Sequence, residues 1–117
     1  DNARSVYTGM IKIAKEAQKT NAYQASKNIL LSKGARANAI PMLEILADDV
    51  KCGHGAAVGS LDDDQRFYLM SRGLPREEAE RAIVEGFFED VLQRIPVPGM
   101  SDRLRAVLDA KLEAPRG

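Results

Sequence analysis

Three apolar segments in the first half of the chain are separated by longer polar stretches, and no tight turn joins them. They cover residues 6–14, 28–32 and 41–47. The two-residue Asn-Gly and Asp-Gly turns that connect the strands of a hairpin do not occur between them. We therefore expect strands that stack in parallel or across larger loops, and a mainly β first half.

The first segment has the alternation of a half-buried strand. Tyr7, Ile11 and Ile13 fall on one face at a spacing of two residues or a multiple of two. Residues 9–19 also have the propensities of an amphipathic helix, and that alternative stays open. The third segment alternates in the same way, and we expect it to remain extended to about Gly55.

The second half has the start and stop signals of helices. Residues 62–64 are three aspartates that can cap a helix over residues 65–72, and Gly73 can end it in the left-handed conformation. A second helix is expected from Pro75 to about Arg94. Four residues at four-residue spacing form its apolar stripe: Ala79, Ile83, Phe87 and Val91.

A third helix is expected beyond the break made by Pro96 and Pro98. Ser101 and Asp102 would cap it, and residues 113–117 should fray. Its apolar stripe would consist of Leu104, Val107, Leu108 and Leu112. The sequence thus predicts about three helices after the strands.

The charge of the chain is balanced overall but not along its length. Its 117 residues carry 17 Lys and Arg against 17 Asp and Glu. Residues 1–60 have 8 basic and 5 acidic residues, a balance of +3, whereas residues 61–117 have 9 and 12, a balance of −3. A net charge of zero gives no bulk attraction to nucleic acid, and no apolar run reaches the roughly 18 residues that span a membrane. We expect one compact unit of two parts, residues 1–60 and 61–117, with neither nucleic acid nor membrane as a partner.

The only cysteine and the only histidine lie two residues apart, at Cys52 and His54. A single cysteine excludes an intrachain disulfide and is consistent with a reducing compartment. Residues 1–10 lack a signal-peptide pattern, so we expect a cytoplasmic protein. If the segment is extended, Asp48, Cys52 and His54 share one face, and the last two are roughly 6.5 Å apart along the strand.

A thiolate and an imidazole on one face are compatible with more than one kind of chemistry. They can bind iron or zinc, or they can form the nucleophile and base of a small Cys-His enzyme. Two ligands are too few for a complete metal site. On these residues alone a structural role is favoured, with Cys52 buried and His54 in a turn. A half-site completed by a partner chain is the remaining metal interpretation.

Three other patterns are weaker signals. The glycines at positions 53, 55 and 59 match neither a dinucleotide-binding nor a Walker A motif, so a turn is favoured over a phosphate site. Residues 62–64 fit a helix cap better than a cation site. The aromatic residues Phe67, Tyr68, Phe87 and Phe88 are expected to pack helices together, although Phe87 and Phe88 cannot both lie at the centre of one stripe.

The order of these motifs resembles the C-terminal core of the SufB/SufD family, which belongs to the Suf machinery for iron-sulfur cluster assembly. The resemblance extends from Val6 to about Leu92. Its most specific parts are the run ADDVKCGHGA and, at a fixed distance after it, the run FYLMSRG. The form of the first run looks more like the SufD branch than the SufB branch.

The resemblance implies a truncated right-handed parallel β-helix followed by a helical segment. It also implies that these residues are the C-terminal part of a longer, non-catalytic scaffold. In the family, SufD pairs with SufB, and a nascent iron-sulfur cluster forms at their interface. His54 would be a ligand or near-ligand there, and Cys52 would be a second candidate ligand. The missing thiolate and carboxylate would come from SufB.

The resemblance further implies that the ATPase SufC docks on the C-terminal helices. The residues expected to bind it are Phe67, Tyr68, Arg72, Phe87 and Phe88. No catalytic residue and no stably bound cofactor are expected. The open end of the β-helix should favour a homodimer or oligomer. A generic interaction module without a metal role and a small Cys-His enzyme remain as alternatives.

Overall fold

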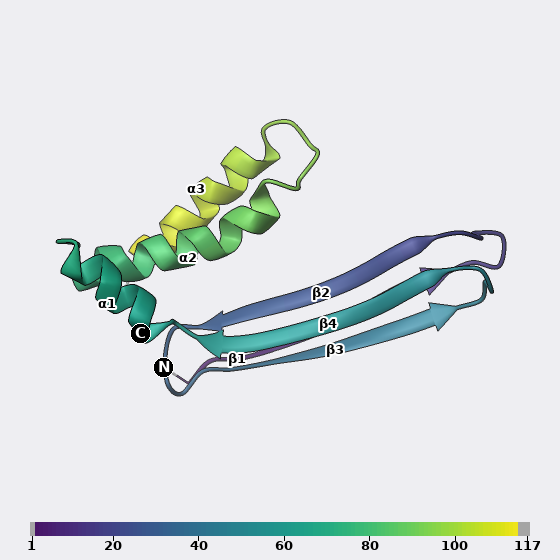
Figure 1. The fold of residues 1–117 in the computed structure, drawn as a ribbon, viewed down its shortest axis with the longest axis horizontal. Coiled ribbons are helices and arrows are strands. Elements are labelled where there is room, and N and C mark those ends of the chain that lie inside the picture. The colour runs from purple at the N-terminus through teal and green to yellow at the C-terminus, as the bar shows by residue number, and fades with distance from the viewer. Residues whose placement is uncertain (1, 115–117) are drawn as a thin grey trace. The chain divides into compact units, whose positions relative to one another are not determined.

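Four strands are followed by three helices in the computed structural model, which describes residues 2–114 (Figure 1). The strands are β1 (Arg4–Ile13), β2 (Asn21–Leu30), β3 (Arg36–Ile45) and β4 (Lys51–Ser60), and the helices are α1 (Asp63–Ser71), α2 (Arg76–Leu92) and α3 (Met100–Glu113). The contacts divide the chain into two compact units, which we call the strand unit (Asp1–Ser60) and the helical unit (Leu61–Gly117). The chain has a mixed α/β fold, whereas the sequence predicted a mainly β fold with C-terminal helices. The order, with the strands before the helices, is as predicted.

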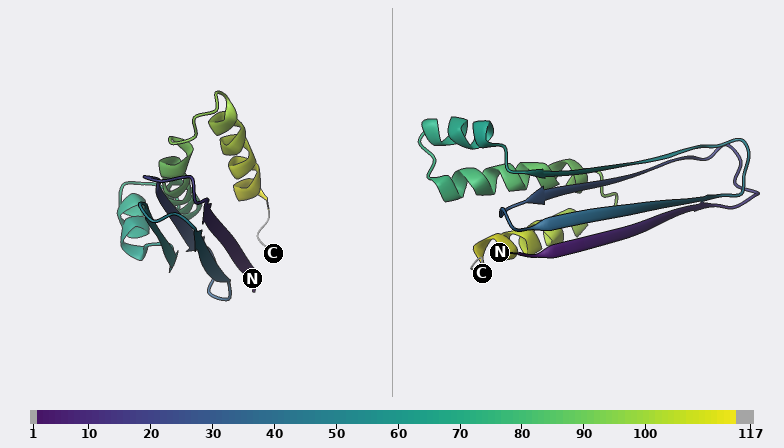
Figure 2. Two further views of the ribbon diagram at one scale, coloured as in Figure 1. Left: turned by 90° about the vertical axis from the view of Figure 1, so that its right-hand side faces the viewer. Right: turned by 90° about the horizontal axis from the view of Figure 1, so that it is seen from below.

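The strand unit contains two parallel two-stranded sheets. β1 pairs with β3 from Arg4↔Arg36 to Ile13↔Ile45, a constant offset of 32 residues. β2 pairs with β4 from Asn21↔Lys51, an offset of 30 residues. The chain alternates between the two sheets, and β1 and β3 run in the direction opposite to β2 and β4 (Figures 1 and 2). Parallel pairing is what the absence of hairpin turns predicted.

The two sheets face each other through alternate residues of their strands. The Gln24 Nε2 donates a hydrogen bond of 3.2 Å to the Tyr7 Oη, which joins β2 to β1 across the interior. Ile13 lies on the same face of β1 and is only 3% exposed. The alternative of a helix over residues 9–19 is therefore wrong. Residues 9–13 belong to β1, and residues 14–19 form the following turn.

β2 is longer than the apolar segment expected at residues 28–32. It begins at Asn21 because all ten of its residues pair in register with β4. Three of its half-buried positions are polar: Gln24, Ser26 and Asn28. The hydrophobic alternation that marks a strand in the sequence is therefore missing over most of β2.

A turn at residues 46–50 separates β3 from β4, so the expectation of one continuous strand to Gly55 is wrong. This turn is hydrogen-bonded to the turn after β1. The backbone N–H of Asp49 donates to the Gln18 Oε1 at 2.9 Å, and the backbone N–H of Lys19 donates to the Asp49 carbonyl oxygen. Lys19 has a left-handed φ of 63°. These bonds hold the two turns together at one end of the strand unit.

The first two helices begin and end close to the predicted residues. Asp62 caps α1, because its Oδ1 accepts hydrogen bonds from the backbone N–H groups of Asp64 and Gln65. Gly73 has a φ of 100°, which confirms the left-handed residue after α1. In α2 the buried residues are Ala79, Val84 and Leu92. The predicted stripe is wrong at Val91, which is 57% exposed.

Helix α3 is joined to α2 by ion pairs. The Arg105 Nη2 lies 2.7 Å from the Glu89 Oε1, and the Arg81 Nη2 lies 3.1 Å from the Asp109 Oδ1. The hydrogen bond from Arg105 lowers the pKa of the Glu89 carboxyl below its ordinary value, although burial acts in the opposite direction. None of the described residues of α3 is fully buried, and of its apolar side chains Leu108 and Leu112 are half-buried.

Two predictions about α3 are wrong. The helix begins at Met100 after Gly99, whose φ of 77° is left-handed, so Ser101 and Asp102 lie in the first turn and do not cap it. Leu104 and Val107 were expected in the buried stripe but are 39% and 57% exposed. The expected fraying concerns residues 113–117, of which 115–117 lie outside the described residues. Within residues 2–114, no helix has the length and apolar character needed to cross a membrane.

Candidate functional site

Cys52 and His54 lie on the face of β4 that is turned toward the other sheet. The ring of Tyr23 lies on the opposite face of the sheet, over Gly53. One of its atoms is 3.4 Å from the position that a Cβ on Gly53 would occupy. Residues next to Gly53 in the strand therefore point inward. In register, Cys52 stands beside Ala22 and His54 beside Gln24. The structure thus places the predicted pair on one strand face, two residues apart.

The two side chains differ in accessibility. Cys52 is half-buried and carries no disulfide, whereas His54 is exposed. β4 pairs only with β2 among the described residues, so the other edge of the strand beside His54 has no strand partner within residues 2–114. An exposed imidazole at an unpaired edge is accessible to a second protein.

Tyr23, Gly53 and Gly55 shape the backbone around His54. A Cβ at Gly55 would overlap the hydroxyl oxygen of Tyr23, so the ring of Tyr23 covers the outer face of both glycines. The expectation of a turn at residues 53–59 is wrong, because these residues belong to β4. At Gly55 the close approach of the Tyr23 hydroxyl, and not a turn, disfavours a side chain, whereas at Gly53 a Cβ would be in ordinary contact with the ring.

Gln24 is a residue of the site that the sequence did not identify. Its Nε2 donates to Tyr7, while its Oε1 is buried and has no hydrogen-bond partner among the described residues. Only the register between β2 and β4 places Gln24 beside His54. The sequence signal that could have found it is a 30-residue offset between two strands, and the polar composition of β2 hides that offset.

The described residues do not form a complete metal site. Over the part of the chain that the structure describes, no group of three or more His, Cys, Asp and Glu side chains could hold a metal ion. Asp48, which was expected on the same face as Cys52 and His54, lies in the turn before β4. Asp62 and Asp63 serve the cap of α1 and an ion pair with Arg66, as expected of a helix start. The site consists of one thiol and one imidazole.

The five residues predicted to bind a partner lie on the helical unit, and four of them form two contacting pairs. Arg72 lies over the ring of Tyr68, 5.3 Å from its centre, and the rings of Phe87 and Phe88 meet edge to face at 5.2 Å. Phe67 is 74% exposed, Tyr68 55% and Phe88 37%. Phe87 is half-buried, so of the two phenylalanines it is Phe88 that faces outward more.

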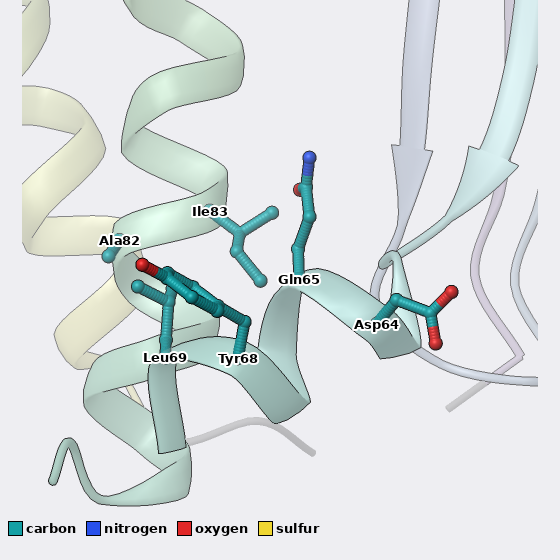
Figure 3. A pocket seen from close by; sticks show the side chains of 6 residues that line it. All are labelled: Asp64, Gln65, Tyr68, Leu69, Ala82 and Ile83. Carbon is teal, nitrogen blue, oxygen red and sulfur yellow. The ribbon is translucent and has the colours of Figure 1, made fainter. Parts of the chain in front are cut away.

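A groove of about 490 Å³ lies between α1 and α2 (Figure 3). Tyr68 and Gln65 line it from α1, and Ile83 lines it from α2. The full set of lining residues is Asp64, Gln65, Tyr68, Leu69, Ala82 and Ile83. Of these, only Tyr68 was predicted as a binding residue. The exposed aromatic surface thus continues into a largely apolar groove.

Comparison with known proteins assigns the chain to a class. Residues 1–87 match the family model described as "SUF system FeS cluster assembly, SufBD core domain". The chain belongs to this SufB/SufD family. Within it the chain is SufD-like, because proteins named SufD are similar to it over nearly its whole length.

Three relatives illustrate the similarity. The iron-sulfur cluster assembly protein SufD of Bacillus subtilis is 44% identical over 97% of this chain, and SufD of Escherichia coli is 38% identical over 96%. The chloroplastic protein ABCI7 of Arabidopsis thaliana is 39% identical over 89%. The matched region covers 26%, 26% and 22% of these relatives, so the chain spans about a quarter of their length.

Proposed function

We propose that this chain is part of a SufD-like, non-catalytic scaffold for iron-sulfur cluster assembly, which pairs with SufB and docks the ATPase SufC. The observation that carries the proposal is the position of Cys52 and His54, on one face of a strand whose outer edge is unpaired within the part of the chain that the structure describes. Family membership supports the assembly role.

The strand unit would form the last coils of a right-handed parallel β-helix. Support comes from the alternation of the chain between two parallel sheets and from the constant offsets of 32 and 30 residues. Such offsets correspond to one coil of about 30 residues. Within residues 2–114, β4 has one edge paired with β2 and one unpaired edge. The β-helix of SufB would meet β4 at this unpaired edge, and a second copy of the chain would meet it there where SufB is absent.

The nascent cluster is the cargo of the scaffold, and this chain would hold it only in part. Iron-sulfur clusters are held mainly by thiolates, and histidine replaces cysteine in some of them. His54 would supply one ligand at the interface, with Cys52 as a second or as a packing residue. SufB would supply the remaining thiolate and carboxylate, because the described residues contain no group of three or more candidate ligands.

The test of this role is cluster formation on the reconstituted complex of the full-length gene product with SufB and SufC. His54→Ala should strongly reduce the yield of cluster while leaving the complex intact by size-exclusion chromatography. Lys51→Ala is the matched control, because Lys51 is an exposed residue of the same strand on the opposite face. Cluster formation by His54→Ala at the rate of the control variant would contradict the ligand role.

SufC would bind the exposed aromatic surface of the helical unit. Phe67 and Tyr68 are exposed on α1, and Phe88 is exposed on α2. Aromatic side chains that pack into a partner commonly contribute most of the binding energy at an interface. The groove beside Tyr68 would receive an apolar side chain of SufC.

Binding of purified SufC to the full-length protein tests this surface by calorimetry. Phe67→Ala combined with Tyr68→Ala should weaken binding by at least tenfold, since truncation of a central aromatic residue typically costs about 2 kcal/mol. Val107→Ala on α3, which removes another exposed apolar side chain, is the control. An unchanged affinity in the double variant would place the SufC site elsewhere.

A further inference from the structure

We propose that Gln24 is a positioning residue for His54. Its side-chain oxygen would accept a hydrogen bond from one nitrogen of the imidazole and leave the other nitrogen for the nascent cluster. This inference rests on the proposed ligand role of His54. It concerns a different residue on a different strand. It also predicts which nitrogen of the imidazole carries the proton in the metal-free protein.

The orientation of the Gln24 amide is the first observation. Its Nε2 donates to the Tyr7 Oη at 3.2 Å, which fixes the direction of the amide plane. The Oε1 on the other side of the amide is buried and lacks a partner among the described residues. A buried amide oxygen without a hydrogen bond is unfavourable, so a donor that reaches it stabilises the site.

The register of the strands places such a donor next to it. Gln24 pairs with His54, and both side chains lie on the inward face of their sheet. Adjacent strands are about 4.8 Å apart, a separation that an amide and an imidazole on paired residues can bridge. A neutral imidazole carries one N–H donor and one nitrogen that can bind a metal. The residue that accepts from the N–H therefore determines which nitrogen is presented to a metal.

Gly9 provides the space that the amide needs. A Cβ at Gly9 would overlap both the Gln24 Nε2 and the Tyr7 Oη. Both atoms are at the ends of side chains, so an alanine at position 9 would displace the amide without requiring the backbone to move. Gly9→Ala therefore disturbs the position of the Gln24 amide and leaves its chemistry unchanged.

The experiment measures the imidazole directly by ¹⁵N NMR of the metal-free full-length protein, with the His54 signals assigned from a His54→Gln variant. At a pH where the ring is neutral, wild type should show one dominant tautomer. Gln24→Leu and Gly9→Ala should each give a mixture, whereas Gln24→Glu, which keeps an acceptor oxygen, should retain the dominant form. Ser26→Ala is the control, because Ser26 lies on the same face and pairs with Ala56 instead of His54.

Cluster formation separates this inference from the proposed function. Gln24→Leu should also slow cluster formation by about tenfold, within the range typical of residues that orient a metal ligand. If His54→Ala has no effect on cluster formation but Gln24→Leu changes the tautomer, the ligand role fails and the positioning role stands. If Gln24→Leu and Gly9→Ala are folded by circular dichroism and leave the tautomer unchanged, Gln24 does not position His54.

Discussion

The substitution Gly55→Ala should destabilise the strand unit when Tyr23 is present and stabilise it when the hydroxyl of Tyr23 is removed. An alanine Cβ at position 55 would overlap the Tyr23 Oη, whereas the next atom of the ring, Cζ, would be at an ordinary contact distance of 3.4 Å. The conflict therefore involves a single oxygen atom. In the Tyr23→Phe background that atom is absent, and the alanine fits.

The magnitude follows from the exposure of Tyr23. The residue is 68% exposed, so about a third of its surface is buried, or roughly 60 Å² of the 150–250 Å² that a buried aromatic side chain covers. Swinging the ring away would lose about 1.5 kcal/mol at ~25 cal/mol per Å². Alanine is favoured over glycine within a strand by about 0.5–1 kcal/mol. Gly55→Ala should thus cost about 0.5–1 kcal/mol with Tyr23 and add about that much stability with Phe at position 23.

Urea unfolding followed by circular dichroism measures the double-mutant cycle of positions 23 and 55. The expected coupling is about 1.5 kcal/mol, which is within the usual range for side chains in contact. Gly59→Ala is the matched control, because a Cβ there would meet no atom within 4 Å and should stabilise both backgrounds equally. A coupling below about 0.5 kcal/mol, or stabilisation by Gly55→Ala in wild type, would refute the placement of Tyr23 over the glycines.

Three further predictions concern the helical unit. Val84 is 2% exposed, so Val84→Ala should lower the free energy of unfolding by about 2–3 kcal/mol. Val91 is 57% exposed on the same helix, and Val91→Ala should change the free energy of unfolding by less than about 0.5 kcal/mol. Equal effects of the two substitutions would contradict the described buried face of α2. Asp62→Ala removes the acceptor that caps α1 and should cost about 1 kcal/mol in the same assay, and no loss would mean that the cap is not formed in solution. The pKa of Glu89 is lower in the folded chain than its ordinary value of 4.5, so the stabilisation by Arg105 is complete above that value and is lost as the pH falls through the lowered pKa. Thermal unfolding at about pH 6 and at about pH 3 should therefore show a smaller loss of stability for Glu89→Gln than for wild type, and identical losses would exclude this ion pair as a source of acid sensitivity.

The helices could be predicted from the sequence because their signals are local. Asp62 caps a helix that begins one residue later, and Gly73 ends it with a left-handed φ. The start of α3 was misplaced because Gly99 forms the boundary through its backbone conformation, whereas Ser101 and Asp102 offered the more familiar capping side chains. Two possible helix starts, Gly99 and Ser101, thus lie within three residues of each other, and the capping side chains alone indicate the wrong one.

The strands were harder to predict because their stabilising partners are distant in the sequence. β2 has polar side chains at half-buried positions, and the Gln24 Nε2 bonds to Tyr7, 17 residues earlier in the chain. The positions of Cys52 and His54 on one strand were visible in the sequence, but Gln24 and Tyr23 were not. Their relation to His54 depends on register, which a single sequence with few apolar inward residues does not specify.

The constant offset of the paired strands has a kinetic consequence. Every strand pair in the strand unit joins residues 30 or 32 positions apart, whereas the backbone bonds of a helix join residues four apart. Chains rich in such distant contacts fold more slowly than helical ones because a long loop must close before any contact forms. During folding, α1 and α2 should therefore form well before His54 comes to lie beside Gln24, and the part of the chain that carries the candidate ligands should be completed last.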